Sequence, residues 1–158
     1  MSSYFFFFFK EVTQLEVNNA LTSIKSKAEG ADGIPITFIN KLSHILLPII
    51  TDIYNLSFRT GKFPKSWKQA IVKPILKSSN LSSEEYRPIS FLSVLSKALE
   101  KLAHRQITEY LNKNSILNRS QSGFRKLHSA ASALVKITDD FHKSMDESKL
   151  TILIFIRF

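Results

Sequence analysis

Lysine and arginine side chains dominate one stretch of the sequence. Between Asp52 and Glu84 there is no acidic residue, and the same window carries six basic ones: Arg59, Lys62, Lys65, Lys68, Lys73 and Lys77. Charges of one sign at this density repel one another unless an anion lies against them. The phosphates of a nucleotide or nucleic acid are the obvious anions, because both side chains bind phosphate oxygens. The alternative is a solvated basic face that only keeps the protein soluble.

The basic excess extends over the whole chain. Of its 158 residues, 22 are Lys or Arg and 13 are Asp or Glu, which gives a net charge of +9. A second basic set comprises Lys97, Lys101, Arg105, Arg119, Arg125 and Lys126, and the first three are spaced to share one helical face. Such a surplus favours nucleic acid or an anionic membrane surface as partner. The longest apolar run falls well short of the roughly 18 residues of a membrane span, so we expect nucleic acid and no membrane.

Metal and thiol chemistry find little support in the residue types. The chain has no Cys, and its four His are scattered: His44, His104, His128 and His142. We therefore expect no disulfide, no thiol nucleophile and no protein-held metal. The pair Asp139-Asp140 offers two adjacent carboxylates, but it lies within a helical pattern. We interpret it as part of a solvated helix face.

The elements that would position the basic residues are mostly helices. Thr13-Gln14-Leu15-Glu16 has the form of a capping box and predicts a helix start. Apolar residues then recur at helical spacing over 38–54, 94–111 and 130–145. Pro48 should kink the first of these helices or start a second one, and Gly61 should end it.

Two short β-prone segments lie within and just after the basic window. Gln69 to Leu76 and Arg87 to Leu92 predict strands joined by a polar turn, and Pro74 places the first strand at an edge or a bulge. Leu150 to Phe158 predicts one further strand. The expected fold is α+β, mainly helical with a small antiparallel hairpin.

The first ten residues differ from the rest. Five consecutive Phe follow Tyr4, with no preceding basic residue and no small-residue cleavage site, so they do not form a signal peptide. We expect residues 1–10 to be a low-complexity leader outside a domain of residues 11–158. On this hypothesis the domain would be equally stable without residues 1–9, and the protein would be intracellular.

A series of short phrases resembles a known family. In order they are Gly30-Ala31-Asp32-Gly33-Ile34-Pro35, Gly61-Lys62-Phe63-Pro64, Val72-Lys73-Pro74-Ile75, Tyr86-Arg87-Pro88-Ile89-Ser90 and Gln121-Ser122-Gly123-Phe124-Arg125. Each phrase alone is weak, but their order and gaps, over roughly Thr13 to Val135, resemble the fingers region of LINE-type (non-LTR, jockey-like) retrotransposon reverse transcriptases. The resemblance implies part of the fingers and the start of the palm of a right-hand polymerase.

The resemblance also implies roles for individual residues. Lys77 and Arg87, with Lys73 as a less certain third member, match positions that hold the triphosphate of the incoming nucleotide. Gln121, Gly123 and Arg125 match a segment that lies along the template strand. Each has a structural alternative: Arg87 would pair with Glu84 or Glu85, while Phe124 and Trp67 are expected in the core. Gly33 and Pro35 are typical of a turn.

The metal-binding side of such a site is not matched. The family places its first catalytic Asp after an apolar strand, and Arg157 stands at that position here. Mg²⁺ is expected for the complete family enzyme, whose clustered carboxylates would hold it, whereas a cation at Arg157 would repel it. We therefore assign no catalytic residue. The hypotheses are a reverse transcriptase fragment, a non-catalytic nucleic-acid-binding module, and a fold-only interaction domain whose charge serves solubility. Separately, we expect exposed apolar surface through which the chain could self-associate.

The chain by itself is expected to give no primer extension on a poly-A template with Mg²⁺, because nothing at position 157 can hold the metal. Incorporation of labelled nucleotide above a no-protein control would contradict this prediction.

Overall fold

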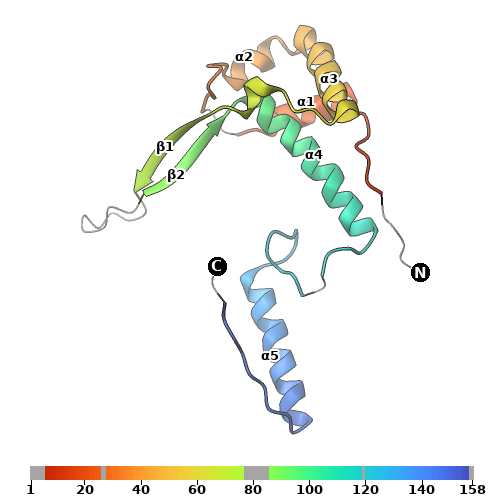
Figure 1. Cartoon of the computed structure of the whole chain (residues 1–158), viewed down its shortest axis with the longest axis vertical. Helices are drawn as coiled ribbons and strands as arrows, with labels where there is room; N and C mark the ends of the chain where they lie inside the picture. The colour runs from red at the N-terminus through yellow and green to blue at the C-terminus, as the bar shows by residue number, and fades with distance from the viewer. Residues whose placement is uncertain (1–5, 26–27, 77–85, 119, 157–158) are drawn as a thin grey trace. The chain divides into compact units, whose positions relative to one another are not determined.

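The computed structural model describes residues 6–25, 28–76, 86–118 and 120–156 (Figure 1). The chain divides into two compact units, Met1–Leu111 and Asn112–Phe158. The first unit holds the predicted hairpin and most of the helices. The second holds the loop around Gln121 and one long helix.

The observed elements agree with the predicted class, a mainly helical chain with a small antiparallel sheet. In chain order they are α1 (Gln14–Thr22), α2 (Ile36–Lys41), α3 (Ser43–Thr60), the 3₁₀ turn η1 (Lys65–Lys68), β1 (Ala70–Leu76), β2 (Tyr86–Leu92), α4 (Val94–Lys113) and α5 (Ala130–Asp146). Strands β1 and β2 pair with each other, and α1 and α2 both contact α3.

Helix boundaries follow local chemistry, with one exception. The capping box is confirmed: the Thr13 N–H donates to Glu16 Oε2 at 2.9 Å, and the Glu16 N–H donates to Thr13 Oγ1 at 3.3 Å. Gly61 ends α3 in the left-handed conformation, with φ at 65°. The exception is Pro48, because the helix starts anew after Leu42 and runs through the proline. His44, whose carbonyl loses its helical partner, is exposed, so water can satisfy that carbonyl.

Tyr54 lies at the centre of the first unit's core. Its side chain has 0% exposure, its hydroxyl donates to the Leu95 carbonyl at 2.7 Å, and its ring meets Trp67 edge-on at 5.8 Å. Burial raises the pKa of Tyr54, so the phenol remains a hydrogen-bond donor. The apolar residues around it come from every helix of the unit: Val17, Ala20, Leu21, Ile36, Ile39, Ile50, Val94, Ala98, Leu99 and Leu102. Trp67, which we predicted in the core, is partly buried and packs against the core.

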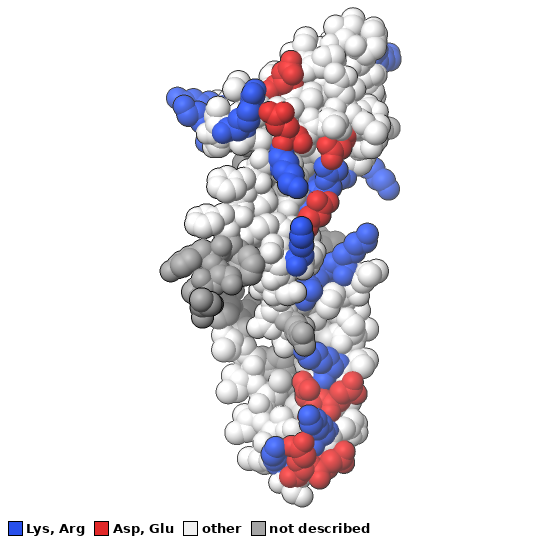
Figure 2. Space-filling view, turned by 90° about the vertical axis from the view of Figure 1, so that its right-hand side faces the viewer, with Lys and Arg blue, Asp and Glu red and all other residues white. Residues whose placement is uncertain are grey.

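The basic face of α4 is used largely within the unit. Arg105 forms an ion pair with Glu16 and lies 3.8 Å from Glu109, and Lys101 donates to Ser23 Oγ at 2.6 Å. On the face drawn in Figure 2, basic and acidic side chains lie interspersed and form no single basic patch. The pKa of Glu16 is lowered, first by the hydrogen bond from the Thr13 backbone and further by Arg105. These contacts tie both ends of α1 to α4.

The apolar stripe over residues 38–54 is only partly buried. Ile50 and Tyr54 lie inside, but Ile45, Ile49 and Ile53 are exposed, because α3 packs its other side against α1 and α2. Phe38 of α2 is exposed as well. Helix α5 buries no residue. The exposed apolar surface that we expected is therefore present on both units.

The prediction of a last strand over Leu150 to Phe158 is wrong for residues 150–156. This segment is exposed, carries no regular structure, and runs back from the end of α5 (Figure 1). A β-prone sequence forms a strand only where a neighbouring strand accepts its backbone hydrogen bonds. In the described part of the chain, the one sheet consists of β1 and β2.

Two phenylalanines of the predicted leader contact α3 and α4. The Phe9 ring stacks on Phe58 at 4.9 Å, and the Phe7 ring lies 5.1 Å from Tyr110. The division between a leader of residues 1–10 and a domain of residues 11–158 remains a prediction. The ring contacts favour a domain that includes Phe7 and Phe9.

Replacing Glu16 with Gln should lower the thermal unfolding midpoint at pH 7. The folded-state pKa of Glu16 lies below its ordinary value, so its contribution to stability is present above that value and is lost as the pH falls through the folded-state pKa. Unfolding curves of the natural chain and the Glu16→Gln variant should therefore converge as the pH is lowered from 6 towards 3. Asp52→Asn, at an exposed position of α3, serves as the control and should not shift the midpoint. A constant difference between the two chains across that range would contradict the prediction.

Candidate nucleotide and nucleic-acid contacts

The hairpin presents two of the predicted nucleotide-binding residues, Lys73 and Arg87, on one face. The register pairs Lys73 with Ile89 and Ile75 with Arg87. Because side chains alternate between the faces of a strand, Lys73 and Arg87 lie on the same face as diagonal neighbours. Both side chains are exposed. The structure therefore brings together two of the three residues, one from each strand.

Two prolines face each other in the middle of the hairpin. Pro74 pairs with Pro88. Neither has an N–H to donate, so this pair fits only where the ladder exchanges no hydrogen bonds. Both strands of a two-stranded sheet are edge strands, as the prediction from Pro74 requires. The flanking pairs on either side, which include Lys73 and Arg87, then lie at the hydrogen-bonded positions of the ladder.

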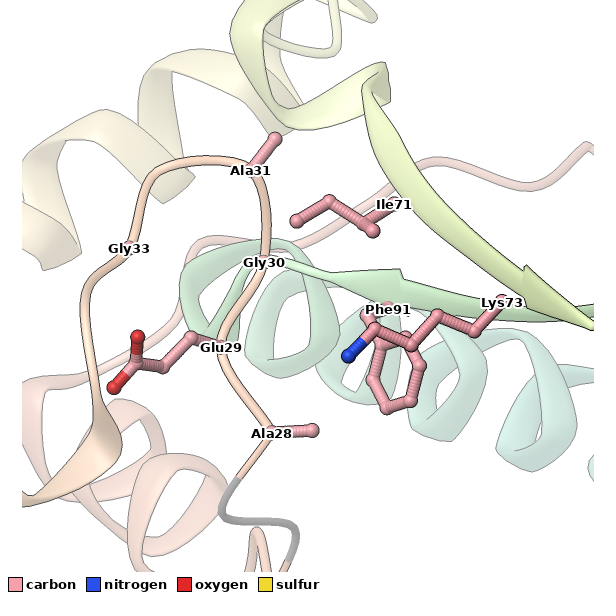
Figure 3. Close-up of a pocket in the computed structure, with 8 residues that line it drawn as sticks. All are labelled: Ala28, Glu29, Gly30, Ala31, Gly33, Ile71, Lys73 and Phe91. Carbon is pink, nitrogen blue, oxygen red and sulfur yellow. The ribbon is translucent and has the colours of Figure 1, made fainter.

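A cavity of about 480 Å³ lies beside the Lys73 end of this face (Figure 3). Its walls are the hairpin residues Ile71, Lys73 and Phe91 on one side and the segment Ala28, Glu29, Gly30, Ala31 and Gly33 on the other. The Lys73 ammonium lies 5.4 Å from the centre of the Phe91 ring, a cation–π arrangement. The lysine head is thus held at the cavity and retains donors for a ligand.

The Gly30 to Gly33 turn forms the second wall of the cavity. A Cβ on Gly30 would lie 2.3 Å from the Ser93 backbone nitrogen, so only glycine allows this close approach to the end of β2. Gly33 adopts φ +63° and its N–H donates to the Gly30 carbonyl at 3.1 Å, while Asp32 Oδ1 accepts from the Ile34 N–H at 3.3 Å. The predicted turn is confirmed. The sequence analysis did not predict that Glu29 and Gly30 line a cavity. The two glycines on either side of Asp32 could have indicated a close backbone approach here.

Lys77 lies outside the described residues, as do Glu84 and Glu85, the alternative partners of Arg87. Their predicted roles stay predictions. Arg59, another residue of the basic window, lies 3.5 Å from the carboxylate of Glu11 and forms an ion pair with it.

The predicted template-contacting residues share one loop of the second unit. The Arg125 guanidinium donates to the carbonyls of Asn118 at 3.2 Å and Gln121 at 3.4 Å. Gln121 in turn donates to the Gly123 carbonyl at 3.4 Å. A Cβ on Gly123 would meet nothing within 4 Å, so the loop is open at this point. Arg125 and Gln121 therefore shape the loop.

The expectation that Phe124 lies in the core is wrong within the described structure. Its side chain is fully exposed, with 109% of the reference area, and its backbone is left-handed at φ 59°. Leu127 in the same loop is 95% exposed, with φ 66°. The left-handed conformations at these two positions turn both apolar side chains towards solvent.

Carboxylates do not converge in the described part of the chain. Across residues 6–25, 28–76, 86–118 and 120–156, no three His, Asp or Glu side chains form a group that could hold a metal ion. Asp139 and Asp140 lie exposed on α5, as predicted. Arg157 is outside the described residues.

No helix in the described segments is both long enough and apolar enough to cross a membrane.

Comparison with known proteins finds several relatives of one kind, although no family model matches the chain. It is 30% identical over 151 residues to a probable RNA-directed DNA polymerase from transposon BS of Drosophila melanogaster, an alignment covering 92% of this chain and 17% of that protein. It is 27% identical over 148 residues to the RNA-directed DNA polymerase from mobile element jockey of the same species, covering 92% of this chain and 16% of the relative. The jockey polymerase of Drosophila funebris is 31% identical over 131 residues, covering 81% of this chain and 14% of its own length.

These relatives agree with the resemblance carried by the short phrases. The chain spans about 17% of the length of the first of these relatives. Similarity over nine-tenths of the chain to polymerases of several mobile elements leaves little of it outside the family pattern. Over nine-tenths of its length the chain is therefore similar to one segment of the RNA-directed DNA polymerases of jockey-like non-LTR mobile elements.

Proposed function

We propose that this chain is the fingers portion of a right-hand RNA-directed DNA polymerase, in which it contacts the incoming nucleotide and the template. The observation that carries the proposal is the placement of Lys73 and Arg87 on one hairpin face beside an open cavity. The chain's relatives bear the name of polymerases that copy RNA into DNA.

A triphosphate suits this pair of cations. Diagonal neighbours on a sheet lie roughly 7–8 Å apart, which matches two separate phosphates of one nucleotide. Arg87 offers a planar fork of donors for phosphate oxygens, and Lys73 offers a mobile point charge. Lys77 is proposed as the third cation. Within the described residues of the hairpin, no acidic side chain competes for these groups.

The loop of Gln121, Gly123 and Arg125 is the proposed template contact. Two donor contacts hold Arg125 to the loop's own carbonyls, and a guanidinium with five N–H groups retains others for a phosphate. The space at Gly123 lets a strand approach the backbone. The exposed ring of Phe124 offers a platform on which a base of single-stranded RNA can stack.

Mg²⁺ is proposed for the complete enzyme, where clustered carboxylates would hold it and the ion would stabilise the negative charge of the reacting phosphate. The donor set of the described residues does not fit such a site, because their carboxylates do not converge. The proposed contribution of this chain is to bind and orient nucleotide and template.

Removing either hairpin cation should weaken nucleotide binding. Arg87→Ala and Lys73→Ala are each expected to raise the dissociation constant of a fluorescent deoxynucleoside triphosphate about tenfold or more, because a charge-assisted phosphate bond contributes about 1.5–3 kcal/mol. Lys41→Ala, an exposed cation at the end of α2, is the matched control and should leave binding unchanged. Equal losses in all three variants would show that only net charge matters and would contradict the proposed pair.

Removing the Phe124 ring should weaken RNA binding without affecting stability. Phe124→Leu is expected to lower affinity for a single-stranded oligonucleotide about tenfold, since one stacked base contributes about 1–3 kcal/mol. Its unfolding midpoint should stay unchanged because the ring buries no surface. Leu127→Ala, an equally exposed apolar side chain in the same loop, controls for nonspecific effects. RNA binding that persists while nucleotide binding is absent would favour the non-catalytic nucleic-acid module.

A further inference from the structure

The segment of residues 6–12 lies against α3 and α4 as an extended peptide would lie in a binding site. Its aromatic side chains alternate, because Phe6 and Phe8 are 76% and 79% exposed while Phe7 and Phe9 are partly buried. An alternation with a period of two is typical of extended backbone with one face docked. The segment precedes α1 and forms no helix or strand of its own.

Two side-chain amides hold the backbone of this segment. Gln106 of α4 accepts from the Lys10 N–H at 2.8 Å and donates to the Lys10 carbonyl at 2.9 Å. Asn55 of α3 accepts from the Val12 N–H at 2.7 Å and donates to the Val12 carbonyl at 3.0 Å. Each amide satisfies both backbone groups of one residue, as a neighbouring strand would, and does so two residues apart. Contacts of this kind depend on backbone conformation and not on side-chain identity.

Side-chain contacts add selectivity. Phe9 stacks on Phe58 and Phe7 meets Tyr110, while the Val12 side chain is buried in the core. The Glu11 carboxylate lies 3.5 Å from Arg59. The pattern received is thus an aromatic residue at two alternate positions, then an acidic residue, then a buried valine.

Space remains beside the docked ring. A cavity of about 240 Å³ is bounded by Phe9 itself, by Phe58 and Gly61 at the end of α3, and by Leu99 and Ala103 of α4. Its wall is mainly apolar. The site therefore does not fit Phe9 tightly, as expected for a site that accepts aromatic side chains of more than one size.

From this geometry we propose that the surface formed by Asn55, Phe58, Gln106 and Tyr110 is a peptide-binding site. It binds an extended peptide that carries aromatic residues two positions apart, and residues 7–12 of the same chain occupy it. Paired hydrogen bonds from side-chain amides to the peptide's main chain supply affinity, and contacts with its side chains supply selectivity, much as in binding modes that add a strand. The covalent link keeps the occupant at a high effective concentration, so a free peptide competes only when the chain's own segment is weakened. The site shares no residue with the hairpin cavity and does not depend on the proposed polymerase role.

A competition experiment on the full chain tests this proposal. A fluorescent peptide with the sequence of residues 7–13, Phe-Phe-Phe-Lys-Glu-Val-Thr, is titrated against the natural chain and against a Phe7→Ser, Phe9→Ser double variant. We expect at least tenfold tighter binding to the double variant, because its own segment docks less well. A control peptide with serine in place of the first and third phenylalanine should bind neither chain.

Substitutions of the amides decide whether the site itself is responsible. Adding Asn55→Ala or Gln106→Ala to the double variant should abolish peptide binding, with circular dichroism confirming that the helices remain. Hydrogen exchange of the unaltered chain gives a second measurement: the Lys10 and Val12 amides should be protected, and Gln106→Ala should release Lys10 alone. Peptide binding that survives both amide substitutions, or free exchange of both amides in the natural chain, would overturn the proposal. Free exchange would instead support a leader outside the domain.

Discussion

The hydrogen bond from the buried Tyr54 hydroxyl to the Leu95 carbonyl is the constraint on which the first unit depends. It fixes the middle of α3 to the first turn of α4, immediately after β2 ends. The close approach of Gly30 to Ser93 holds the same junction from the other side. The base of the hairpin is therefore set by a buried phenol and a glycine, while the hairpin itself buries almost nothing. The core therefore sets the direction in which Lys73 and Arg87 face, although neither residue belongs to the core.

The basic residues divide into two groups with different physical uses. On α4, Lys101 and Arg105 are within reach of oxygens from α1, and they bond to it. On the hairpin, Lys73 and Arg87 stand on a two-stranded sheet with exposed faces and no acidic residue in either strand. A cation already satisfied by a carboxylate contributes less to binding an external phosphate. The net charge of +9 therefore overstates the surface available to nucleic acid, and the hairpin cations are its more available part.

The apolar side chains, like the basic ones, divide into a set used within the fold and a set left exposed. The inner side of α3 meets α1 and α2, but Ile45, Ile49 and Leu56 on its outer side remain exposed, as do Leu134 and Val135 on α5. The chain spans about 17% of the first relative described above, and in a longer protein such surfaces are where further parts of a fold can pack. The peptide-like docking of residues 7–12 shows that one surface of the first unit, across α3 and α4, accepts an extended segment.

The sequence by itself determined the family resemblance, the capping box at Thr13, the helix end at Gly61 and the pairing of two strands in and after the basic window. These features depend on local backbone chemistry or on the order of short phrases, and both can be read directly from the sequence. A second helix start at Pro48, the burial of Phe124 and a strand over residues 150–156 were predicted wrongly, because each depends on what lies nearby in space. A proline is tolerated where its unpaired carbonyl partner meets water, an aromatic residue is buried only if a surface receives it, and a β-prone segment needs a neighbouring strand. Only the tertiary structure showed that Gln106 binds the backbone of Lys10 and that Asn55 binds the backbone of Val12. Contacts between residues more than 40 positions apart produce no periodic pattern in a single sequence. An Asn or Gln on a helix gives no sign in the sequence of whether it binds a distant backbone or only water.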